Sequence, residues 1–152
     1  MMGLGDRLRE ELKHALKTGN KRASSAIRMV LAAAQNQAIE KGSPLSDAEF
    51  VDTIVSSIKQ RRESIEFYKQ GHRPDLEAKE SEEIQILQGF LPPPITENEA
   101  KEKIRQAIVQ VDATSPKDVG KVMKVLMPGL RGQLDGGTLN RWVVELLTPS
   151  GG

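Results

Sequence analysis

Three consecutive prolines at positions 92–94 constrain this chain more than any other feature of its sequence. Proline has no backbone N–H to donate and its ring fixes φ, so a run of three interrupts both helices and sheets. Such a run forms an extended spacer. We therefore expect two domains, residues 1–91 and residues 95–149, joined by a proline hinge, and a chain of 152 residues can supply a small core for each.

Before the prolines, four segments carry apolar residues at helical spacing. The first ends at Gly19, the second covers about residues 21–41, and the third follows Ser46 and ends near Gly71. The fourth follows an N-cap at Asp75 and ends near Gly89. Ser46 and Glu49 have the spacing of a capping box, in which each side chain binds the backbone N–H of the other residue. This half is predicted to be a four-helix domain.

After the prolines, three shorter helical segments follow. One begins after Thr96, the next begins at Pro116 and ends at Met127, and the last begins near Asp135 or Thr138. No segment shows the strict apolar and polar alternation of a strand. We therefore predict an all-α fold, in which the C-terminal domain has three helices.

The composition and the missing motifs of the sequence exclude several classes of function. The chain has no cysteine, so disulfides, cysteine-based zinc sites and a thiol nucleophile are excluded. No apolar run is long enough to span a bilayer and no signal-peptide pattern is present, so we expect a cytoplasmic protein without a membrane span. Hydrolase, zinc-protease and nucleotide-binding motifs are also missing. We expect no catalytic residues, no cofactor and no metal.

The charge is unevenly distributed although the net charge is only +1. Residues 116–141 contain five basic and two acidic residues, and the segment 120–137, which includes the break between the last two predicted helices, is rich in glycine. It is either a tight helix corner or an anion-binding site, because glycines allow backbone N–H groups to approach a phosphate. The candidate RNA-binding residues are Gly120, Lys121, Lys124, Arg131, Gly132, Gly136, Lys117 and Arg141. Asp135 would oppose a phosphate unless its carboxylate caps the last helix.

A second charged segment, residues 58–71, also has two interpretations. The pairs Lys59–Glu63 and Arg62–Glu66 have the spacing of stabilising ion pairs on an exposed helix, and this interpretation is favoured. In the functional interpretation, Arg61, Arg62 and Lys69 form a secondary basic surface for phosphate or for a protein partner. The adjacent carboxylates Glu82 and Glu83 are expected on an exposed helix face.

Four segments in the same order resemble the YqeY-like family, and the resemblance covers nearly the whole chain. They are IRMVLAAAQNQAIEKG (27–42), IKQRRESIEFYKQG (58–71), LPPPITENE (91–99) and DVGKVMKVLMPGLRGQLDGGTLNRWVVELL (118–147). This family is similar to the C-terminal tail of the GatB subunit of the aspartyl/glutamyl-tRNA amidotransferase. The glycine and lysine pattern at 120–136 is the most specific part. The sequence departs from the pattern at Leu134, where a small residue is usual.

The resemblance implies a four-helix half, a three-helix half and an RNA-binding role. In the amidotransferase the tail engages the outer region of tRNA, and related domains are fused to some glutaminyl-tRNA synthetases. By position, Lys121, Lys124 and Arg131 are the implied RNA contacts. Similarity alone would name the chain a carbon–nitrogen ligase with glutamine as amide donor, but the residues for that chemistry are not in the sequence.

Three hypotheses remain open. The first is a free-standing module that binds tRNA or another structured RNA and is not catalytic on its own. The second is a protein-interaction adaptor that docks on an aminoacyl-tRNA synthetase or an amidotransferase, for which an exposed apolar patch around Trp142, Met123 and Met127 would be the sign. The third is an accessory component of glutamine-dependent amidotransferase activity.

Overall fold

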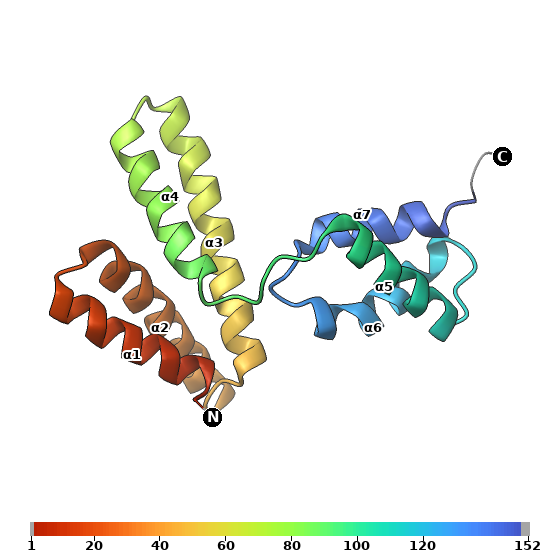
Figure 1. Cartoon of the computed structure of the whole chain (residues 1–152), viewed down its shortest axis with the longest axis horizontal. Coiled ribbons are helices and arrows are strands. Elements are labelled where there is room, and N and C mark those ends of the chain that lie inside the picture. The colour runs from red at the N-terminus through yellow and green to blue at the C-terminus, as the bar shows by residue number, and fades with distance from the viewer. Residues whose placement is uncertain (1, 150–152) are drawn as a thin grey trace. The chain divides into compact units, whose positions relative to one another are not determined.

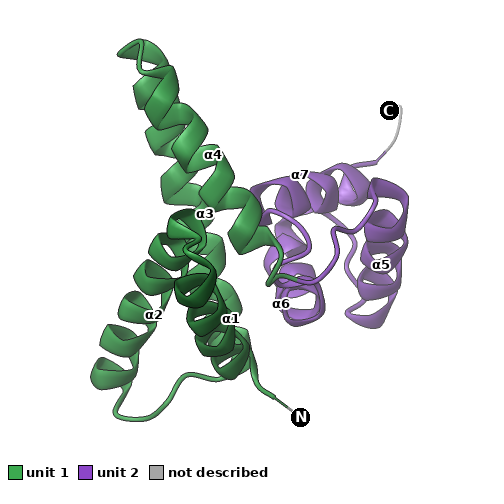
Figure 2. Ribbon diagram, turned by 60° about the vertical axis from the view of Figure 1, so that its left-hand side comes forward, with its two compact units in different colours: residues 1–91 green, residues 92–152 purple. Residues whose placement is uncertain are grey.

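The structure, a computed structural model, describes residues 2–149. In this part of the chain it contains seven α-helices and one short 3-10 helix and no strand, so the prediction of an all-α fold is confirmed. The contacts divide the chain into two compact units, residues 1–91 and residues 92–152 (Figure 2). None of the described helices is both long and apolar enough to cross a membrane.

Unit 1 (residues 1–91) consists of four helices. They are α1 (Leu4–Thr18), α2 (Lys21–Lys41), α3 (Asp47–Gln70) and α4 (Pro74–Gln88). As Figure 1 shows, they form two hairpins, α1 with α2 and α3 with α4, and α2 also packs against both helices of the second hairpin. The core is aliphatic, and its fully buried residues include Leu8, Ile27, Ile54 and Leu87.

Local sequence accounts for the ends of these helices. Gly19 and Gly42 follow α1 and α2 with φ of 71° and 81°, the left-handed conformation that glycine adopts without a Cβ clash. The predicted capping box at Ser46 is confirmed, because Ser46 Oγ accepts from Glu49 N at 3.2 Å and Glu49 Oε1 accepts from Ser46 N at 3.0 Å. Glu49 also binds Lys41 Nζ at 2.5 Å, and this contact is the main reason that its pKa falls from 4.5 to about 2.

The N-cap predicted at Asp75 is wrong. α4 begins at Pro74, whose fixed φ suits the first helical position, and Arg73 is the N-cap. Asp75 therefore lies in the first turn, where its carboxylate binds the Arg73 guanidinium at 3.1 Å. The guanidinium lowers the pKa of Asp75, mainly through its hydrogen bond.

Unit 2 (residues 92–152) contains α5 (Glu97–Gln110), the 3-10 helix η1 (Pro116–Asp118), α6 (Val119–Leu130) and α7 (Gly136–Leu147). Each of the three α-helices contacts the other two. Their shared core is separate from that of unit 1, and it contains Ile104, Val122, Leu139 and Val143.

The sixth helix begins and ends later than predicted. It begins at Val119, directly after the 3-10 helix that starts at Pro116, and it continues through Pro128 and Gly129 to Leu130, so the end predicted at Met127 is wrong. Leu130 is buried one turn after Leu126, and burial of this side chain favours a last turn that local propensity disfavours. The left-handed residue is instead Gly132, with φ of 81°.

The proline segment makes specific contacts within unit 2. The Pro93 carbonyl accepts a hydrogen bond from Gln133 Nε2 at 3.1 Å, and Ile95 N donates to the Gln133 carbonyl at 3.3 Å. Residues 93–95 therefore pair with the connection between α6 and α7. This arrangement differs from the solvated spacer that proline content alone indicates, because a proline carbonyl still accepts hydrogen bonds.

Candidate nucleic-acid interface

One face of α6 and the turn before it carries lysines. Lys121 and Lys124, three residues apart, lie on the side of α6 opposite to the buried Val122 and Leu126. Lys117, in η1, precedes Lys121 by one helical turn. All three side chains are exposed, and that of Lys121 is 69% exposed. The amphipathic pattern that buries the apolar side of α6 therefore also orients these charges toward solvent.

Asp118 is the acidic residue in contact with this face. Its Oδ2 accepts from Thr114 N at 2.9 Å, and its Oδ1 lies 3.7 Å from Lys121 Nζ. The Thr114 N–H is the main reason that the pKa of Asp118 lies below its ordinary value, and the nearby Lys121 lowers it further. The contact is long and the Lys121 side is exposed to solvent, so the pair contributes little and Lys121 can still bind a phosphate.

The Asp135 carboxylate caps α7. This is the arrangement in which Asp135 is expected not to oppose the binding of a phosphate. Its Oδ2 accepts from Thr138 N at 3.0 Å and from Thr138 Oγ1 at 3.2 Å. It thereby satisfies the backbone N–H of Thr138 in the first turn of α7. Gly136 is the first residue of that helix, and a Cβ added there would meet no atom within 4 Å.

The predicted glycines differ in what the fold requires of them. Gly132 has a positive φ, which a residue with a side chain adopts only with strain. Gly120 lies in the first turn of α6 without a positive φ, and a Cβ built on it would be in open space. Neither backbone conformation nor internal packing therefore requires glycine at position 120.

The two predicted arginines differ in position from the three lysines. Arg131 is the C-cap residue directly after α6 and is half-buried. Arg141 is exposed on α7, on the side away from the buried Leu139 and Val143. The three lysines are therefore the best-placed cations of the predicted set.

The secondary basic surface predicted in α3 is wrong for Arg61. Its side chain is 6% exposed and lies between α2 and α4, where Nη1 binds Glu80 Oε2 at 3.0 Å and also binds Glu83, and Nη2 contacts Met29 Sδ at 3.4 Å. Arg62 and Lys69 are exposed, and Lys69 binds Glu66 at 3.2 Å. The Arg61 charge is therefore unavailable to a phosphate.

Glu83, expected on an exposed face, is 1% exposed. Two carboxylates share one guanidinium in this cluster of Arg61, Glu80 and Glu83, and Arg61 Nε and Glu83 Oε1 have no hydrogen-bond partner. The sequence does hold a signal for this cluster. Arg61 falls in the apolar row that contains Ile58 and Ile65, while Glu83 directly precedes the buried Ile84.

The apolar residues that would mark a protein-docking patch pack inside unit 2. Trp142, Met123 and Met127 are partly buried against its core. Lys101 Nζ lies 6.0 Å from the centre of the Trp142 ring and 3.0 Å from Glu97. The sign expected for the adaptor hypothesis is therefore not found at these residues.

The sequence of this chain matches a known protein family. The profile of a family described as "Yqey-like protein" matches residues 5–147 and so includes both units. The chain belongs to the YqeY-like family. Its predicted membership is confirmed. Within residues 2–149 of this YqeY-like protein, no group of three or more histidine, aspartate or glutamate side chains is placed to hold a metal ion.

Several fungal proteins are similar to this YqeY-like protein. The three described next share the name "Altered inheritance of mitochondria protein 41, mitochondrial". The protein from Pyrenophora tritici-repentis is 29% identical over 129 residues, which are 84% of this chain and 71% of the relative. That from Lachancea thermotolerans is 28% identical over 72% of this chain and 60% of the relative. That from Eremothecium gossypii is 32% identical over 55% of this chain and 46% of the relative.

These names contradict the predicted cytoplasmic location, since the relatives are described as mitochondrial. The prediction rested on the missing apolar span and the missing signal-peptide pattern. Both features are equally compatible with the interior of a mitochondrion, so they had no power to distinguish the two compartments.

Proposed function

We propose that this YqeY-like protein binds structured RNA, with tRNA as the first candidate, through the lysine face of α6. The lysine face is defined by Lys117, Lys121 and Lys124. The observation that carries the proposal is that Lys121 and Lys124 are exposed on the side of α6 opposite its core, and Lys117 is exposed one turn before them. Among the described residues, the ion pair found for these lysines is the 3.7 Å contact of Lys121 with Asp118. Such cations bind phosphates by charge-assisted hydrogen bonds.

Recognition rests on RNA shape and phosphate groups. Binding of unpaired bases depends on exposed aromatic side chains on which the bases stack. Trp142 is the one aromatic residue after position 91, and its ring packs into the core of unit 2 beneath Lys101. The lysine face therefore suits the backbone of a folded RNA, and its affinity depends strongly on salt because it rests on phosphate contacts.

The protein acts as a binding module without a catalytic site of its own. Support comes from the resemblance to the tRNA amidotransferase tail, which lies apart from the residues of that enzyme's chemistry. The proposal also includes the organisation of the chain: four helices before the prolines and three after them, with a hinge near position 92. The two separate hydrophobic cores support this organisation.

Fluorescence anisotropy with labelled tRNA tests the proposal. We expect the variant Lys117→Ala, Lys121→Ala, Lys124→Ala to bind at least about tenfold more weakly than the parent at low salt, since it loses three phosphate contacts. The matched control is Lys17→Ala, Lys21→Ala, Lys59→Ala, which removes the same charge from exposed positions of unit 1.

The control separates a local site from attraction by overall charge. We expect it to bind tRNA within about twofold of the parent. Equal weakening of the two triple variants would show that net charge, and not the lysine face, determines binding. Unchanged binding by the α6 variant would show that the RNA contacts lie elsewhere.

A further inference from the structure

Unit 1 contains a pocket that the RNA proposal does not use. Its volume is about 440 Å³, within the range of roughly 300–1,000 Å³ that is typical of small-molecule sites. It lies where α1, α2, the connection after α2 and the start of α3 meet. The residues that line it are Arg9, Leu31, Ala34, Gln35, Ala38, Pro44, Leu45 and Phe50.

The wall of this pocket is mainly apolar. Ala34 and Phe50 belong to the buried core of unit 1, and Leu31 and Leu45 pack against that core. Position 5 helps to shape the wall, because a Cβ on Gly5 would lie only 2.9 Å from the Phe50 ring. Glycine there lets the ring lie against the backbone of α1, and a larger residue would displace it. The wall therefore suits an apolar ligand group.

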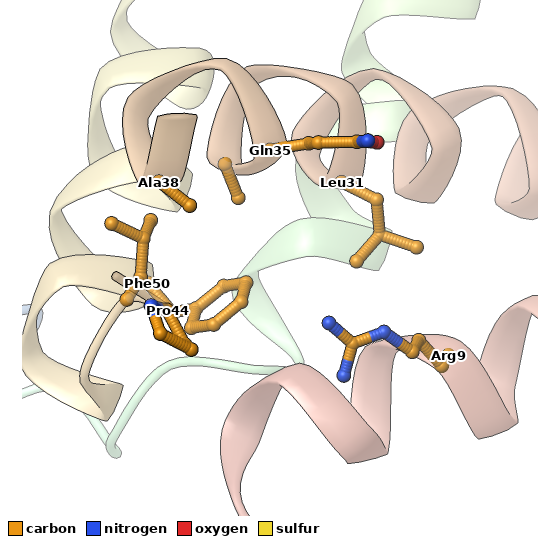
Figure 3. A pocket seen from close by; sticks show the side chains of 8 residues that line it. Arg9, Leu31, Gln35, Ala38, Pro44 and Phe50 are labelled. Carbon is orange, nitrogen blue, oxygen red and sulfur yellow. The ribbon is translucent and has the colours of Figure 1, made fainter. Parts of the chain in front are cut away.

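Two polar side chains, from different helices, are among the residues that line the pocket. Figure 3 shows the Arg9 guanidinium reaching from α1 toward the space between Leu31 and Phe50, with Gln35 of α2 on the opposite side. Arg9 is the one charged residue among those that line the pocket. An apolar wall with a single cationic group is complementary to a small molecule that has an apolar body and an anionic head.

Arg9 can bind such a head without breaking a strong internal interaction. Its Nη1 lies 3.3 Å from Asp6 Oδ1, and the two side chains are 60% and 62% exposed. Exposed pairs of this kind contribute little to stability. The guanidinium has further N–H donors in a planar fork that matches both oxygens of a carboxylate. A ligand carboxylate would therefore find an available partner.

We propose that this pocket binds a small amphiphilic carboxylate, with its carboxylate on Arg9 and its hydrocarbon chain against Leu31, Ala38 and Phe50. The site is independent of the lysine face, since every lining residue belongs to unit 1. Loss of RNA binding in the α6 variant would therefore leave this site intact.

Two-dimensional ¹H–¹⁵N NMR titration of the full chain with sodium octanoate tests the proposal. We expect saturable shifts in the amides of residues 31–38 and 45–50. Octan-1-ol, which has the same chain and no charge, should bind at least about fivefold more weakly because it forms no ion pair with Arg9. Octanoate shifts that are absent, unsaturable or confined to other residues would overturn the site.

Variants separate the charge from the cavity. Arg9→Gln should remove the preference for octanoate over octan-1-ol, whereas Lys13→Gln, on the same helix but outside the pocket, should leave it unchanged. Ala38→Phe should reduce binding of both probes by filling the space, and its spectrum shows directly whether it is folded. A preference that survives Arg9→Gln, or is lost equally in Lys13→Gln, would overturn the role of Arg9.

Discussion

At the residue scale, Arg61 and Arg62 are adjacent in sequence and lie in different surroundings. The Arg61 side chain is buried between two carboxylates, while that of Arg62 is exposed. We expect Arg61→Ala to lower the free energy of unfolding by about 3–5 kcal/mol, because it leaves two carboxylates near the core without their cation. Urea unfolding followed by circular dichroism measures this loss.

Arg62→Ala is the matched control for that experiment. It removes the same charge one position along α3, and we expect a change within about 0.5 kcal/mol because the site is exposed. If both variants lost equal stability, overall charge would be responsible, and the buried cluster of Arg61, Glu80 and Glu83 would have no special role.

The capping box at the start of α3 predicts a dependence on pH. The pKa of Glu49 in the folded protein is lowered from 4.5 to about 2, mainly by Lys41. A lowered pKa contributes stability that is complete above 4.5 and is lost as the pH falls toward 2. We expect the thermal midpoint of the parent to fall more between pH 5 and pH 2 than that of Glu49→Gln.

Parallel thermal scans of the two proteins at several pH values provide the measurement. Glu49→Gln retains a side chain that can bind the backbone N–H of Ser46 but has no charge to titrate. The difference in midpoint between parent and variant should shrink as the pH decreases through this window. A difference that stays constant would mean that the Lys41 contact does not stabilise the folded state.

At the element scale, most helices could be predicted from sequence, because their ends carry local signals. Gly19, Gly42 and Ser46 act through the conformation or hydrogen bonding of their own neighbourhood, so a linear sequence reveals them. The end of α6 could not be predicted in this way. Pro128 and Gly129 disfavour helix locally, and the burial of Leu130 depends on how three helices pack.

The difference between local signals and tertiary packing also explains which parts of the candidate site could be predicted from the sequence. The lysine face follows from helical spacing and could be predicted, but the burial of Arg61 depends on Glu80 and Glu83 from another helix. The pocket at Arg9 joins residues that are far apart in the chain. Tertiary contacts determine these features, and local patterns constrain them only weakly.

Two glycines near the end of α6 should respond oppositely to alanine. Gly129 is helical, its φ is not positive and an added Cβ meets nothing within 4 Å, so Gly129→Ala should stabilise unit 2 by about 1 kcal/mol. Gly132 has φ of 81°, so Gly132→Ala should destabilise it by about 1–2 kcal/mol. Urea unfolding followed by the fluorescence of Trp142, the single tryptophan, reports on unit 2. Changes of the same sign in both variants would contradict the helix end described for α6.

At the scale of the whole molecule, two separate cores predict two unfolding transitions. Trp142 fluorescence should follow unit 2, whereas circular dichroism follows all the helices. We expect the two signals to give different urea midpoints, and Arg61→Ala to shift the dichroism curve while the fluorescence curve stays in place. Coincident curves that shift together in this variant would show that the units unfold as one.

The central claim is that phosphate groups of RNA bind the lysine face, and the salt dependence of tRNA affinity tests it most directly. Each phosphate contact adds about 0.7–0.9 to the slope of log affinity against log salt concentration. The variant without Lys117, Lys121 and Lys124 should therefore show a slope about 2–3 smaller than that of the parent, and the unit 1 control should match the parent. Equal slopes for the parent and the α6 variant would contradict the account.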